Sequence, residues 1–174
     1  MVDLVTLDRD QVMKALEIAH LRNAPKEAGG VAPSSYGQRA LSAHLTGSLA
    51  EIAAAVRYGV EIDENFYMAG DGHRADIKVN GWDVEVKGAS HKPPILKFNQ
   101  LIEFKSDVAL LCYVDRDQIK KNGGERADVE LHGVVSRVKF NNNHYVKSFG
   151  YGDRYCMAAA SLADPKALED RSKQ

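Results

Sequence analysis

Apolar and polar positions follow two different periods along the chain, and these periods predict its helices and strands. Helical spacing of apolar residues predicts an amphipathic helix over 8–22 and an alanine-rich helix over 41–58. The segment between them, 23–40, is rich in glycine, proline and serine and predicts a long loop. The other predicted elements are strands over 61–68, 107–114 and 128–136, a short helix over 95–105, a charged loop over 115–127, and one late edge strand before a frayed tail over 163–174. This order predicts an α/β domain with a mixed sheet flanked by helices.

The clearest local prediction is a hairpin in the segment DIKVNGWDVEVKG, residues 76–88. Asn-Gly between two alternating runs is typical of a tight turn of two residues, here Asn80 and Gly81. The pairs that this turn sets opposite each other are Ile77 with Val84, Val79 with Trp82, Lys78 with Asp83, and Asp76 with Glu85. The first two pairs are apolar and the third is a surface ion pair. The fourth sets two carboxylates face to face, which costs stability.

Two facing carboxylates are tolerated where a cation lies between them, and a divalent metal serves this purpose well. Mg²⁺ binds hard oxygen ligands, commonly one or two carboxylates together with water and substrate phosphate. Strand alternation sets Lys87 on the same side as Asp76 and Glu85, and the main-chain carbonyl of Val86 is a further oxygen ligand. A metal ion and a lysine together suit the hydrolysis of a phosphodiester.

With Glu51 on the upstream helix, these residues resemble the PD-(D/E)xK nuclease superfamily. The GSLAE helix, the VEVKG strand, the apolar strand that begins at Asp107, and the later LHGVVS and YGDRYCMAAASL segments are similar to small phage-encoded members. The likeness extends from about residue 22 to residue 162, with Arg74-Ala75 where the superfamily usually has a proline before the first acid.

The resemblance implies a restriction-endonuclease-like core, with a mixed sheet of four to five strands between helices. It also implies DNA as the partner, Mg²⁺ or Mn²⁺ as the cofactor, and cleavage of DNA as the activity. Asp76, Glu85, Glu51 and the Val86 carbonyl would then hold the metal, and Lys87 would act in the chemical step.

Plainer interpretations stay open for each site residue. Glu51 also fits an exposed helix acid, and Lys87 fits an ordinary surface lysine. Asp71, in the AGDGHR segment, is an alternative to Asp76 as the metal acid.

Several polar residues near the motif are predicted to support the lysine or to contact substrate. Gln100 resembles a polar position that supports the lysine in related nucleases. His73 and Arg39 are candidates for substrate contact, and solvated side chains are the alternative for both. Arg22 and Lys26, around the long loop, have the same two interpretations.

Composition bounds these hypotheses without choosing among them. The 174 residues suit one domain, and 44% hydrophobic and 27% charged residues are average for a soluble globular protein. A net charge of −1 and a pI near 6.6 argue mildly against a nucleic-acid partner, although an acidic metal site with a local basic rim gives the same balance. A homodimer stays open.

The N-terminal stretch MVDLVTLDRDQV has acids where a signal peptide needs basic residues, and no apolar run reaches the length of a membrane span. We therefore expect no membrane partner and a cytoplasmic location, in the host if the protein is viral. Cys112 and Cys156 are predicted to be buried, inert thiols.

The hypothesis that fits best is a metal-dependent deoxyribonuclease. The alternatives are a catalytically inactive nucleic-acid-binding module on the same scaffold and a structure-specific endonuclease that resolves DNA junctions. Motifs of other enzyme classes, such as GxGxxG after a strand, a P-loop, GxSxG or HExxH, are missing from the sequence.

Overall fold

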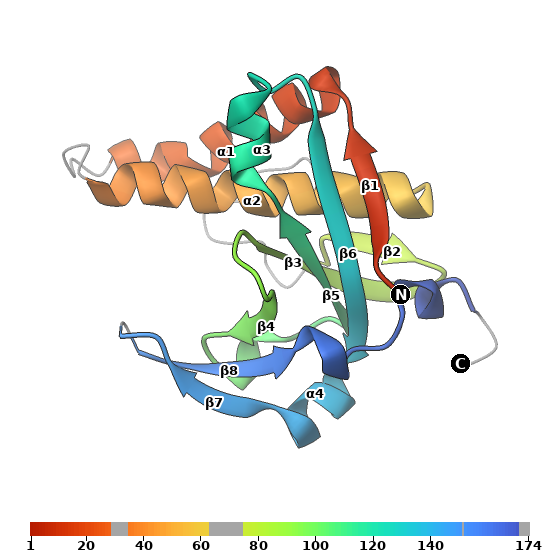
Figure 1. Ribbon diagram of the computed structural model, residues 1–174. Helices are drawn as coiled ribbons and strands as arrows, with labels where there is room; N and C mark the ends of the chain where they lie inside the picture. Colours follow the sequence, from red (N-terminus) through yellow and green to blue (C-terminus); the bar gives the residue numbers. More distant parts are fainter. Residues whose placement is uncertain (29–34, 63–74, 151, 171–174) are drawn as a thin grey trace.

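The computed structural model describes residues 1–28, 35–62, 75–150 and 152–170, and side chains within 24–28 and 35–40 are outside the description. Its centre is a five-stranded mixed sheet with the strand order β1-β6-β5-β3-β2 (Figure 1). The strands are β1 (Asp3–Leu7), β2 (Ile77–Val79), β3 (Trp82–Ala89), β5 (Val108–Val114) and β6 (Ala127–Ser136). Strand β3 runs parallel to β5, and the other neighbours are antiparallel. The predicted α/β class with a mixed sheet and flanking helices is confirmed.

Two long helices, α1 (Arg9–Ala28) and α2 (Ser35–Tyr58), lie side by side across one face of this sheet (Figure 1). The alanines of α2, such as Ala53, pack with the fully buried side chains of the central strands, including Leu110 and Leu131. Small residues let the helix approach the sheet closely, and the main core therefore lies between α2 and strands β3, β5 and β6.

A second sheet of three strands packs below the first, in the order β4-β8-β7 (Figure 1). Its strands are β4 (Ile95–Phe98), β7 (Tyr145–Ser148) and β8 (Asp153–Ala158). Short helices complete the fold: η1 (Leu101–Glu103), α3 (Arg116–Lys121), α4 (Arg137–Asn143), η2 (Ala159–Ser161) and η3 (Pro165–Leu168). A second core lies between the sheets, where Phe98 stacks on Phe104 at 4.7 Å between ring centroids and Phe140 meets both rings edge-on.

The predicted hairpin is confirmed in its turn and in three of its four predicted pairs. The fourth, Asp76 with Glu85, is not part of the ladder, because β2 begins at Ile77. Ile77 pairs with Val84, Lys78 with Asp83, and Val79 with Trp82. Asn80 and Gly81 have positive φ angles of 50° and 90°, the backbone conformation that Asn-Gly adopts readily in a two-residue turn. Lys78 Nζ lies 2.8 Å from Asp83 Oδ1, so the predicted surface ion pair is also present.

The helix predicted over 95–105 is wrong, because this segment forms strand β4 followed by the single turn η1. The helical prediction used the spacing of Ile95, Phe98 and Ile102, but Ile102 is 74% exposed. The residues that are buried are Leu96 and Phe98, which alternate as in a strand. Pairing with β8 therefore decided the structure over a short apolar run that fitted both periods.

Several element boundaries also differ from the prediction. The segment 23–40 is not one long loop, since α1 continues to Ala28 and α2 begins at Ser35; residues 29–34 lie outside the description. Helix stability comes mainly from tertiary packing, which composition does not reveal. Glu61 and Ile62 are not in a strand, and the rest of the predicted strand over 61–68 lies outside the described residues. Strand β1 and helices α3 and α4 were not predicted, and the single late edge strand is the pair β7 and β8.

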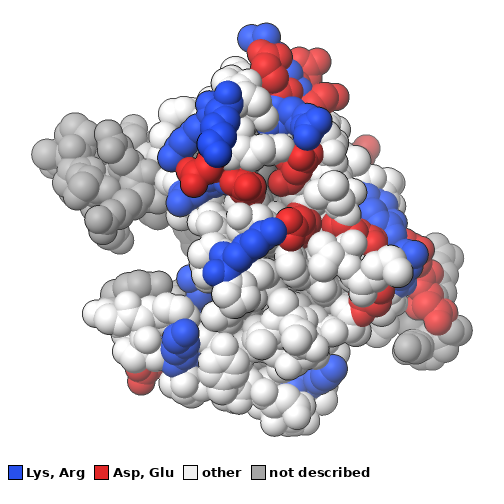
Figure 2. Space-filling model, viewed as in Figure 1, with Lys and Arg blue, Asp and Glu red and all other residues white. Residues whose placement is uncertain are grey.

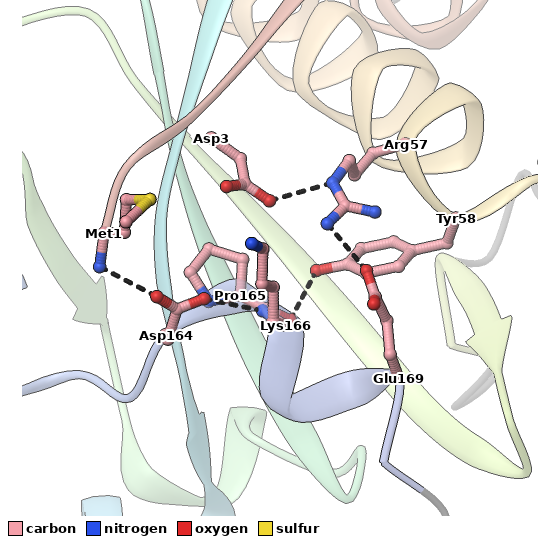
Figure 3. Close-up of polar contacts among 8 residues, drawn as sticks. All are labelled: Met1, Asp3, Arg57, Tyr58, Asp164, Pro165, Lys166 and Glu169. Atoms are coloured by element: carbon pink, nitrogen blue, oxygen red, sulfur yellow. Dashed lines mark hydrogen bonds and ion pairs between the residues drawn. The ribbon is translucent and has the colours of Figure 1, made fainter.

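The C-terminal segment is anchored rather than frayed as far as the structure describes it. Leu168 is buried, and Tyr58 Oη donates a hydrogen bond to the Pro165 carbonyl. Arg57, at the end of α2, joins Asp3 of β1 and Glu169 of this segment, with nitrogen–oxygen distances of 2.8 and 2.6 Å (Figure 3). These contacts tie the end of α2 to the edge of the sheet.

Two expectations from composition can be compared with the structure. Cys112 and Cys156 are buried free thiols, as predicted, and burial raises the pKa of both, which disfavours the reactive thiolate. Among the helices of the described chain, none has the length and apolar character needed to cross a membrane.

Candidate functional site

The site begins where helix α2 crosses strand β3 at Gly88. A Cβ atom at this position would lie only 2.7 Å from the main-chain oxygen of Thr46 on α2. Glycine therefore permits an approach that any other residue would obstruct. The close crossing brings Glu51, one turn further along α2, toward the strand that carries Glu85 and Lys87.

Replacing Gly88 with alanine is expected to destabilise the fold by about 2 kcal/mol, because the new methyl group would press on backbone that cannot move freely. Gly47→Ala is the matched control. Its Cβ would have the Glu51 Oε1 atom, at 4.0 Å, as its nearest neighbour. That substitution is expected to gain about 0.5–1 kcal/mol of helix stability. Urea unfolding of the two variants measures the difference, and equal midpoints would show that the crossing tolerates a side chain.

Asp76 lies just before β2 and reaches across to β3. Its Oδ2 atom accepts a hydrogen bond from the Val86 main-chain N–H at 2.6 Å. This contact places the Asp76 carboxylate beside β3 at the residue between Glu85 and Lys87. The Val86 amide thus has a role that sequence reasoning did not foresee, while its carbonyl stays a predicted ligand.

The electrostatics of Asp76 show which charged groups surround it. The pKa of Asp76 is raised to about 7, mainly by burial and then by the negative charges of Glu51 and Glu85, while the Val86 N–H and Lys87 oppose the shift. The structure therefore brings together the four predicted side chains, from α2, from the start of β2 and from β3.

The raised pKa makes a prediction for stability without metal. Between its ordinary value of 3.8 and about 7, folded Asp76 holds a proton that the unfolded chain has already lost. This contribution to stability is complete below the ordinary pKa and is lost as the pH rises to about 7. Asp76→Asn, which carries no ionisable proton, is expected to unfold at a midpoint that falls less between pH 5 and pH 8 in chelator. If the unfolding midpoints of wild type and variant fell equally between pH 5 and pH 8, the raised pKa of Asp76 would be contradicted.

Each of the other two carboxylates is held by a cation of the chain. Arg22, near the end of α1, donates from both terminal nitrogens to the two oxygens of Glu51, at 2.7 Å each. Lys87 Nζ pairs with Glu85 Oε1 and also lies 4.9 Å from the centre of the Phe98 ring. Glu51 is 7% exposed, which rules out the alternative of an exposed helix acid. Lys87 is not an ordinary surface lysine either, since it belongs to this cluster.

The cluster suits a hard divalent cation in its chemistry but is not arranged around one. Its three carboxylates offer only oxygen donors, which Mg²⁺ and Mn²⁺ prefer. Within the described residues, no group of three His, Cys, Asp or Glu side chains is already disposed as a set of metal ligands. Arg22 and Lys87 each contact carboxylate oxygens that a metal would need.

The remaining predicted site residues have different outcomes. Gln100 is exposed at the start of η1, and its side chain makes no capping hydrogen bond there. His73 and Asp71 lie outside the described residues, as do the side chains of Arg39 and Lys26. Arg22 was predicted as a phosphate contact or a solvated residue, and the structure gives it a third role as the partner of Glu51.

Comparisons of the chain with protein-family models, with curated proteins and with solved structures found no match. The argument for function therefore depends on the residues of the cluster.

Proposed function

We propose that this protein is a metal-dependent nuclease that hydrolyses phosphodiester bonds in DNA. One observation carries the proposal: Glu51, Asp76 and Glu85 converge with Lys87 where burial and mutual repulsion raise the pKa of Asp76 to about 7. Crowding of carboxylates in a half-buried place costs stability, and clustered groups of perturbed pKa are common at functional sites. A bound divalent cation would relieve this cost.

In this proposal the three carboxylates, with the Val86 carbonyl, hold Mg²⁺ or Mn²⁺. The bound cation would supply a Lewis acid that neutralises charge on the phosphate and lowers the pKa of a water molecule. Asp76 would have to be ionised to hold the cation, and Lys87, which pairs with Glu85, would have to turn toward the phosphate. There its ammonium group donates hydrogen bonds to an oxygen on which negative charge develops in the transition state.

A second candidate is a nucleic-acid-binding module without catalytic activity on the same scaffold. It is favoured by the pairing of Glu51 with Arg22 and of Glu85 with Lys87, since these internal cations already neutralise two of the acids. A junction-resolving endonuclease differs from the main proposal only in the form of its DNA. For each of these activities, DNA would be the partner and the cytoplasm the location.

Incubation with plasmid, linear and branched DNA in Mg²⁺, in Mn²⁺ and in chelator tests the proposal. We expect cleavage of at least one DNA form in either metal and none in chelator. Preference for the branched substrate would identify a junction-resolving enzyme. Binding of DNA without cleavage in either metal would overturn the nuclease proposal in favour of the binding module.

A further inference from the structure

The second sheet has an outer face that the aromatic core does not cover. Along β4, Leu96 and Phe98 point into the core, so that Lys97 lies on the opposite face. The register continues this face across the sheet: Lys97 pairs with Cys156 of β8, which pairs with Tyr145 of β7. Two pairs further along, and so on the same face, Arg154 of β8 lies opposite Lys147 of β7. Three cationic side chains from three strands therefore share one face.

The positive charges of these side chains all act on Cys156, in the central strand β8 of this sheet. Burial raises the pKa of the Cys156 thiol, and the positive charges of Lys97, Lys147 and Arg154 all oppose that shift. His91, in the loop before β4, has its pKa lowered by burial and then by the same two lysines. Lys97 and Lys147 thus act on the same thiol and the same imidazole, which agrees with their place on one face.

Aromatic rings lie among these cations. The Nζ atoms of Lys97 and Lys147 are 5.2 and 5.4 Å from the centre of the Phe149 ring, which thus interacts with both. Tyr145 is 41% exposed on the edge strand β7. Proteins commonly bind single-stranded nucleic acid with positive charges beside aromatic rings, since the cations bind phosphates and the rings stack on bases.

The two lysines of this face have no acidic partner among the described residues. Neither Lys97 nor Lys147 forms an ion pair with a carboxylate of the described chain, and Asp153 alternates onto the opposite face from Arg154. Several lysines elsewhere are paired with acids, as in Lys78–Asp83, Lys92–Glu130 and Lys120–Asp117. On the side that Figure 2 presents, acidic side chains gather over the upper half of the molecule and few lie over the lower half.

We propose that the outer face of the β4-β8-β7 sheet, defined by Lys97, Lys147, Arg154, Tyr145 and Phe149, binds one strand of DNA. The cations would bind its phosphates, and a base would stack on Tyr145. This inference deepens the proposed nuclease function and rests on it for the choice of DNA. Strand β4 links the two places, because Phe98 contacts Lys87 of the candidate site and its neighbour Lys97 lies on the outer face.

The test compares the double variant Lys97→Gln/Lys147→Gln with Lys120→Gln/Lys121→Gln. The control removes the same charge from α3, at the other end of the molecule (Figure 1). Fluorescence anisotropy with a labelled single-stranded oligonucleotide, in chelator and at several salt concentrations, measures binding without cleavage. The slope of log K against log salt is expected to become shallower by about 1.4 for the first variant, since each single-strand phosphate contact contributes about 0.7. The control is expected to keep the slope of the wild type.

A third variant, Tyr145→Ala, is expected to bind the oligonucleotide about tenfold more weakly through lost stacking. Unchanged affinity and salt slope in the lysine variant, with a melting temperature equal to that of the wild type, would overturn the inference. So would equal binding of a blunt duplex, or a preference for RNA of the same sequence. If the salt slope falls as expected while no DNA form is cleaved in metal, the nuclease proposal fails and the binding face stands.

Discussion

Replacing Lys87 with methionine is expected to remove DNA cleavage while leaving Mn²⁺ binding intact. The ammonium group is not a metal ligand in this account, and its partner Glu85 would be freed by the substitution. Metal affinity should therefore stay the same or increase. A positioned charge that acts on the transition state is worth about 10²- to 10³-fold in rate, by analogy with donors of an oxyanion hole. Methionine keeps most of the aliphatic stem that lies over the Phe98 ring.

The control for this experiment is Lys78→Met, on the neighbouring strand of the same hairpin. Lys78 forms only an exposed pair with Asp83, and cleavage by this variant is expected to match the wild type. Single-turnover cleavage at saturating Mn²⁺ measures the chemical step for both variants. Cleavage by Lys87→Met at the wild-type rate would mean that the hairpin is not the active site.

Replacing Arg22 with methionine is expected to destabilise the metal-free protein by about 3 kcal/mol, because it leaves a buried carboxylate without its cation. Glu51 would then face Asp76 with nothing to offset its charge. The same change should strengthen Mn²⁺ binding, because the guanidinium no longer competes for both oxygens of Glu51. Adding Mn²⁺ should therefore recover much of the lost stability.

Arg9→Met provides the comparison on the same helix. The Arg9–Glu125 pair is exposed at both ends, and its loss is expected to cost less than about 1 kcal/mol. Urea unfolding with chelator and with Mn²⁺ measures all four combinations of variant and metal. Equal effects of the two substitutions, or a loss from Arg22→Met that Mn²⁺ does not reduce, would contradict the role given to Arg22.

Local signals in the sequence predicted the part of the site that depends on neighbouring residues. The Asn80-Gly81 turn fixed the register of the hairpin, and this register led to the carboxylates beside Lys87. Strand β5 is a continuous apolar run, and β6 alternates between apolar and polar residues. Both strands could be predicted because these patterns follow directly from which side chains are buried.

Features that depend on distant contacts could not be predicted in this way. Arg22 and Glu51 are 29 residues apart, and their pairing depends on how α1 packs against α2. The outer face of the second sheet needs the register of β4, β8 and β7, which lie far apart in the chain. Strand β4 itself was predicted as a helix, because a short apolar run fits the helical period as well as the strand period. Only its pairing with another strand distinguishes the two.

The proposed nuclease requires that Glu51, Asp76 and Glu85 share one divalent cation. Its most direct test is calorimetric titration of wild-type protein and of Asp76→Asn with Mn²⁺ at pH 8, where Asp76 is ionised. We expect a Mn²⁺ site in the wild type that is lost in Asp76→Asn, although the variant is at least as stable as the wild type in chelator. Mn²⁺ binding of unchanged affinity in Asp76→Asn would contradict the claim and place the metal acid elsewhere, with Asp71 as the first residue to replace.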